Sequence, residues 1–81
     1  YYMEEQKIKH DDFIHIGNNI KSIRIEKNIK QKELLRRLQY SGIQMTRECL
    51  VKIEGERQHI QASQLRGIRD ALGTTYDELL K

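Results

Sequence analysis

Apolar residues recur along the chain at the spacings of three and four that are typical of a helix face. Four of them define the inward face of a first predicted helix: Phe13, Ile16, Ile20 and Ile23. Asp11 or Asp12 could cap the start of this helix, and Asn28 suits the left-handed residue that ends one. The pattern therefore predicts a helix that stops at Asn28, with Ile29 packed back onto the core.

A second helix is predicted to begin near Gln31. Its inward positions are Leu34, Leu35 and Leu38. Residues 40–42 tolerate a turn because they include a serine and a glycine, and Ile43 then returns to the core.

The third helix is predicted over residues 46–54. Thr46 is a suitable N-cap, and Leu50 and Ile53 are three residues apart, so they share one inward face. Gly55 follows as the expected left-handed cap.

Two more helices complete the pattern. A fourth covers about residues 62–72 with Gly73 as its stop, and its inward positions are Leu65, Ile68, Ala71 and Leu72. Thr75, followed three residues later by Glu78, resembles a capping box that opens a short fifth helix. That helix contains Leu79 and Leu80.

Strand-like alternation does not persist anywhere, so the sequence predicts an all-α protein of five helices. The chain has 81 residues and no proline, which suits one helical domain over residues 13–81. Residues 1–12 lack a pattern and are predicted to form a flexible arm. Tyr1 and Tyr2 precede Met3, which is a candidate for the native start.

Charge and cysteine content narrow the possible functions. The formal net charge is +3, and the excess lies in residues 29–57, which hold seven basic and four acidic residues. Such a local basic patch suits attraction to phosphate. A single cysteine excludes an internal disulfide and favours a reducing compartment, and no apolar run is long enough to span a bilayer.

Two short helices joined by a glycine-containing turn in a basic region have the plan of a helix-turn-helix. The segments IGNNIKSIRIEKNIKQKELLRRL, TRECLVKIEGER and ALGTTYDELL resemble the Cro and phage-repressor (xenobiotic-response-element) family over residues 16–80. The resemblance implies a lambda-repressor-like fold and sequence-specific binding of double-stranded DNA by a transcriptional regulator, a repressor acting as a homodimer. It also implies a bacterial or phage-encoded protein of the cytoplasm.

The family pattern assigns roles to residues of the third helix. The positions that match base-reading or flanking ones are Arg47, Glu48, Val51 and Lys52. The same face follows from the residues, because Leu50 and Ile53 point the other way. Arg47 could pair with guanine, Glu48 could accept from a cytosine amine, and Val51 could contact a thymine methyl group.

Further positions match contacts to phosphate or within the fold. Thr46, Arg57 and Gln31 match phosphate-binding positions, and Gln31 could also brace the third helix. Lys30 and Lys32 flank Gln31 beside a helix N-terminus, where phosphate is attracted. Arg24 and Glu54 match a partly buried salt bridge that joins the first and third helices.

The sequence departs from the family pattern in several places. Residues 39–43 are an insertion of about five residues that could lengthen the second helix or widen the turn. Leu35 and Arg69 stand where small residues are common, and Gly67 weakens the interior of the fourth helix. The expected dimer surface is the fifth helix, with Tyr76, Leu79 and Leu80.

Another class of function remains open on the same fold, a protein-interaction or antitoxin-like regulatory domain. The insertion and the acidic Glu48 on the reading face motivate it. An enzyme is not expected, because the sequence has no nucleophile–base pair and no glycine-rich phosphate loop. The three histidines and Cys49 lack metal-ligand spacing, so neither a metal nor another cofactor is expected.

Overall fold

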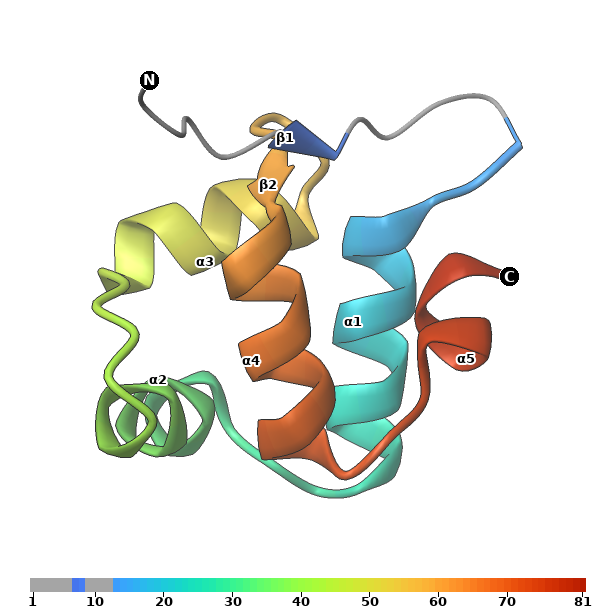
Figure 1. Cartoon of the computed structure of the whole chain (residues 1–81). Helices are drawn as coiled ribbons and strands as arrows, with labels where there is room; N and C mark the ends of the chain where they lie inside the picture. The colour runs from blue at the N-terminus through green and yellow to red at the C-terminus, as the bar shows by residue number, and fades with distance from the viewer. Residues whose placement is uncertain (1–6, 9–12) are drawn as a thin grey trace.

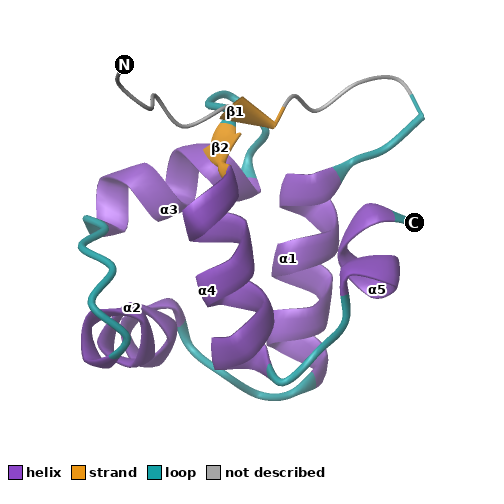
Figure 2. Ribbon diagram, in the orientation of Figure 1, coloured by secondary structure: helices purple, strands orange, loops and turns teal. Residues whose placement is uncertain are grey.

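A computed structural model describes residues 7–8 and 13–81 and shows an all-α fold with one minimal pair of strands (Figure 1). Along the chain the elements are β1 (Lys7–Ile8), α1 (Ile16–Glu26), α2 (Gln31–Tyr40), α3 (Arg47–Glu54), β2 (Ile60–Gln61), α4 (Ala62–Leu72) and α5 (Tyr76–Leu80). Figure 2 shows how helices dominate the described part of the chain. None of the described helices has the length and apolar content needed to cross a membrane.

α1 and α4 lie side by side at the centre of the molecule, with α2 and α3 on one side and α5 against α1 on the other (Figure 1). The inward faces of the helices, together with Ile29 before α2 and Ile60 of β2, form one core of thirteen buried apolar residues: Ile16, Ile20, Ile23, Ile29, Leu34, Leu38, Leu50, Ile53, Ile60, Leu65, Ile68, Leu72 and Leu79. Burial of apolar side chains is the main force that orders helices this short.

Several helix ends follow the chemistry of their residues. Asn28 and Gly73 adopt the left-handed conformation, with φ of 59° and 65°, so the predicted stops of α1 and α4 are confirmed. The hydroxyl of Thr46 accepts from the N–H of Cys49, which confirms Thr46 as the N-cap of α3. Thr75 caps α5 in the same way, through the N–H of Glu78.

The predicted start of α1 is wrong. The helix begins at Ile16, after His15, and Phe13 lies before it with 89% of its surface exposed. Phe13 therefore does not belong to the apolar face. The candidate caps Asp11 and Asp12 lie outside the described residues.

The end of α3 also differs from the prediction. Gly55 has a φ of −84°, and the next residue, Glu56, takes the left-handed conformation with a φ of 61°. The carboxylate of Glu56 accepts from the N–H of Asn18 at 3.0 Å and lies 3.0 Å from Nδ1 of His15. These contacts with the start of α1 offset the cost of a left-handed conformation in a residue with a side chain.

The short strand pair was not predicted. Lys7 pairs with Gln61 and Ile8 with Ile60 in antiparallel register, so part of the expected arm joins the folded domain. The remainder of residues 1–12 lies outside the described residues. Two-residue strands are too short to produce a visible alternation of polar and apolar positions.

Candidate nucleic-acid interface

α3 separates its inward and outward residues cleanly. Leu50 and Ile53 have no exposed surface and belong to the core. The four predicted base-reading residues all lie on the exposed side: Arg47, Glu48, Val51 and Lys52. Val51 is a large apolar side chain that is still 38% exposed. The helix therefore presents a mixed cationic, acidic and apolar row to solvent.

The start of α2 contributes a second exposed basic group. Lys30 and Lys32 are exposed on either side of Gln31, which is half-buried. Lys30 occupies the N-cap position of α2 and makes no side-chain capping bond. The first turn of a helix has N–H groups without intrahelical partners and a partial positive charge, so this end suits an anion.

A buried ion pair joins α1 to the end of α3. Nε of Arg24 donates to Oε2 of Glu54 at 2.8 Å, and Nη2 donates to Oε1 at 3.0 Å. The two residues are 8% and 6% exposed. Nη1 of Arg24 also donates to the carbonyl oxygen of Ile29 at 3.0 Å. Bidentate geometry with further hydrogen bonds is what a buried ion pair needs to offset its desolvation.

Gln31 connects α2 to the same pair. Its Nε2 donates to Oε1 of Glu54 at 3.1 Å, so the side chain braces α3 from the start of α2. No buried side-chain nitrogen or oxygen in the described part of the chain lacks a hydrogen-bond partner. The network fixes the end of α3 relative to the start of α2, and it uses the amide that was also expected to contact phosphate.

The cations near this surface differ in how far they are neutralised. Glu33 pairs with Arg36 at 2.8 Å and with Arg37 at 3.0 Å. These hydrogen bonds, from Arg36 first and then Arg37, hold the pKa of the Glu33 carboxyl below its ordinary value. Nζ of Lys52 lies 3.6 Å from Oε1 of Glu48.

Four other cations have no ion-pair partner among the described residues: Lys30, Lys32, Arg47 and Arg57. Thr46 is exposed at the start of α3, and Arg57 is exposed just after its end. The structure thus places every predicted base-reading residue on the outer side of α3. The unpaired predicted phosphate ligands lie at the ends of α2 and α3.

Residues 39–43, which the family resemblance marks as an insertion, are divided between the end of α2 and its connection to α3. α2 continues to Tyr40 and α3 begins at Arg47, so six residues connect them. Gly42 takes a left-handed conformation, with a φ of 83°, and the N–H of Ile43 then donates to the carbonyl oxygen of Leu38. Ile43 is half-buried against the core, as predicted.

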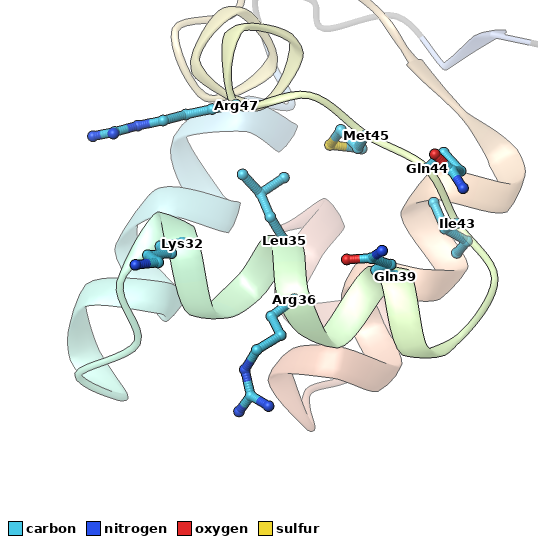
Figure 3. A pocket seen from close by; sticks show the side chains of 8 residues that line it. All are labelled: Lys32, Leu35, Arg36, Gln39, Ile43, Gln44, Met45 and Arg47. Carbon is cyan, nitrogen blue, oxygen red and sulfur yellow. The ribbon is translucent and has the colours of Figure 1, made fainter.

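A hollow of about 530 Å³ lies between this connection and α2, and we call it the α2–α3 hollow (Figure 3). Its lining consists of Lys32, Leu35, Arg36, Gln39, Ile43, Gln44, Met45 and Arg47. Sequence reasoning did not find it. The available signal was the large Leu35, which is only half-buried in the structure.

The predicted dimer surface on α5 does not match the burial of its residues. Leu79 is fully buried in the core, so it cannot form part of a dimer surface on α5. Tyr76 is half-buried under the guanidinium of Arg69, 4.5 Å from its ring centre. Within residues 7–8 and 13–81, no group of three His, Cys, Asp or Glu residues is placed to hold a metal ion.

Comparison of the chain with models of known protein families, with curated proteins and with solved structures finds no significant match. The features of the molecule that bear on its function are therefore α2, α3 and their connection.

Proposed function

We propose that this protein binds double-stranded DNA sequence-specifically and regulates transcription, with α2 and α3 as a helix-turn-helix of the Cro and phage-repressor type. The observation that carries the proposal is the outward row of α3. Its four predicted base-reading side chains are exposed, while Leu50 and Ile53 anchor the opposite face in the core. A single helix fits the major groove of B-form DNA, and its exposed side chains can then reach base edges.

The chemistry of the row suits readout of bases. Arg47 offers a bidentate donor to guanine, Glu48 an acceptor to a cytosine amine, and Val51 an apolar contact to a thymine methyl group. Lys52 is one turn beyond Glu48 on α3 and would lie next to the same groove. The contacts with phosphate are assigned to Lys30, Gln31, Lys32, Thr46 and Arg57.

The network around Glu54 supports this role because base reading needs a helix held at a fixed angle. Arg24 and Gln31 hold Glu54 from α1 and from the start of α2. The phosphate contacts at the start of α2 would therefore set the position of α3 in the groove. One domain gives a small footprint, so we propose a homodimer on two half-sites about 34 Å apart.

Selection from random duplex DNA tests the proposal directly. At about 100 mM salt we expect enrichment of a two-fold symmetric site, bound more tightly than random duplex by a factor of about 10³ or more. Equal affinity for selected and random duplexes would contradict sequence-specific binding.

Replacing Arg47 with alanine should weaken binding to the selected site by about 1–3 kcal/mol, or roughly five- to 150-fold. It should also relax the preference at one base pair of each half-site. Band shifts on a panel of single-base variants of the site measure both effects. Lys21 of α1 is an exposed cation outside the proposed interface, so Lys21→Ala is the matched control. An equal loss with Lys21→Ala would mean that only general charge matters.

Replacing Lys30 and Lys32 together with alanine should weaken binding by a similar factor on every sequence. The slope of log affinity against log salt is negative, and each lost phosphate contact reduces its magnitude by about 0.9. The slope of the double variant should therefore be less steep by about 1.8. Titrations at four salt concentrations, on the selected site and on a scrambled duplex, measure the slope. An unchanged slope would remove these lysines from the phosphate contacts.

The alternative of a protein-interaction or antitoxin-like domain has one observation in its favour. The carboxylate side chain of Glu48 is 82% exposed on the face assigned to DNA, where it would repel phosphates. The selection experiment separates the two functions. No preferred DNA site, together with a protein partner that still binds Arg47→Ala, would favour the alternative.

A further inference from the structure

The α2–α3 hollow combines an apolar floor with a cationic end. Leu35, Ile43 and Met45 line it and are half-buried against the core, so each leaves apolar surface open to the hollow. In Figure 3, Lys32 and Arg47 extend toward the same end, and Leu35 stands between that end and Gln39. The hollow is therefore chemically different at its two ends.

The positive charge at this end is not balanced within the described residues. Lys32 and Arg47 have no ion pair there, whereas Arg36, one turn along α2 from Lys32, is bound by Glu33. A ligand that brings negative charge to Lys32 and Arg47 would therefore gain more electrostatic binding energy than a ligand that brings it to Arg36. Charge complementarity thus selects an acidic occupant for one end of the hollow.

The floor argues for an occupant that also carries an apolar group. A phosphodiester strand has nothing that would gain from covering three apolar side chains, whereas a peptide can insert a leucine or an aromatic ring. The volume of about 530 Å³ is sufficient for such an anchor. The surface continues past Arg36 and Gln39 to Tyr40, which is 83% exposed. Tyrosine, arginine and methionine are enriched in protein interfaces.

We infer that the α2–α3 hollow docks an acidic peptide segment of a protein partner. An apolar side chain of the segment enters between Leu35 and Met45, and its carboxylates pair with Lys32 and Arg47. The same two cations are assigned above to phosphate and base contacts, so partner and DNA exclude one another. This second part depends on the proposed function. The partner is then a regulator that releases the protein from DNA by mass action.

A display library of random 12-residue peptides, selected on the whole 81-residue chain, provides the probe. We expect enriched peptides to carry Asp or Glu beside one large apolar residue. Replacing that apolar residue with alanine should weaken binding about tenfold, as measured by fluorescence anisotropy. Absence of enrichment, or enrichment of basic or purely polar peptides, would overturn the inference.

Three variants locate the site. Met45→Gln removes apolar surface from the floor of the hollow without removing charge. It should weaken binding of the peptide about tenfold and change the affinity for DNA less than about twofold. Arg47→Ala should weaken the binding of both peptide and DNA, and Lys21→Ala should change the binding of neither. Thermal melting of each variant confirms that it is folded. A peptide that binds Met45→Gln as tightly as the unchanged protein does not occupy the hollow, and the inference fails.

Competition tests the second part separately. Adding the enriched peptide to the complex with the selected duplex should release DNA at peptide concentrations near its own Kd. Simultaneous binding of both would overturn mutual exclusion. If the peptide binds but no duplex does, the proposed function fails while the peptide site stands. If DNA binds and no peptide is enriched, only this inference fails.

Discussion

Replacing Glu54 with alanine should lower the free energy of unfolding by about 3–5 kcal/mol, because it strands a buried guanidinium. Arg24 is 8% exposed, and once Glu54 is gone the carbonyl oxygen of Ile29 is its one remaining hydrogen-bond acceptor among the described residues. Gln31 loses its partner at the same time. Urea denaturation followed by circular dichroism measures the effect. A loss of this size is a large share of the stability of a domain this small.

Glu26→Ala is the matched control, because Glu26 is exposed and has no ion pair among the described residues. It should change stability by less than about 0.5 kcal/mol. Glu56 is unsuitable as a control, since its carboxylate caps α1. Replacing both Arg24 and Glu54 with apolar residues should recover much of the loss, because no charge is left stranded. Equal small losses for Glu54→Ala and Glu26→Ala would show that the ion pair contributes nothing.

Replacing Gly17 with alanine should be the second most damaging change. A Cβ at this position would overlap the carbonyl oxygen of Ile53 and approach Cγ of Glu56 at 2.9 Å. Alanine normally stabilises a helix by about 1 kcal/mol relative to glycine. Here α1 and α3 must separate, so we expect a net loss of about 1–3 kcal/mol. The midpoint of thermal or urea unfolding measures it.

Gly67→Ala is the informative comparison. The added Cβ would meet the end of the Ile43 side chain, which is half-buried and can move toward the α2–α3 hollow. The helical gain of alanine should then offset most of the repacking, and the net change should stay within about 1 kcal/mol. If Gly17→Ala is as well tolerated as Gly67→Ala, the close approach of α1 and α3 is not a constraint on stability.

The sequence was sufficient to predict those features that depend on local pattern. The inward residues of α3 follow from the spacing of Leu50 and Ile53, and the buried pair of Arg24 with Glu54 followed from the family resemblance. Asn28 and Gly73 adopt left-handed conformations at the predicted ends of the first and fourth helices. Each of these features depends on a few neighbouring residues, so pattern reading can recover it.

The remaining features depend on contacts between distant segments. The left-handed conformation falls on Glu56 instead of Gly55 because the carboxylate of Glu56 reaches the start of α1, 38 residues away in sequence. The pairing of Lys7–Ile8 with Ile60–Gln61 is also remote, and its strands are too short to show a pattern. Leu79 lies in the core because α5 folds back onto α1.

The α2–α3 hollow is a third feature that could not be predicted from the sequence. The insertion was visible in the sequence, but its length alone could not distinguish a longer α2 from a wider turn. Residues 39–40 end α2 and residues 41–43 lie in the connection to α3, and the space beside them depends on where Leu35 and Met45 come to lie. Side-chain volume that is left unfilled is a property of the packed chain, and no local pattern records it.

The sharing of Glu54 among three helices limits how this surface could be transplanted. α2 and α3 have ten and eight residues, fewer than the roughly 12–15 at which an isolated helix becomes even marginally stable in water. Grafting this pair alone onto another scaffold would carry over the exposed side chains but leave behind Arg24 and the cap that α1 receives from Glu56. The smallest exchangeable unit is therefore the whole bundle, and changes of specificity are best made by substitution on its surface.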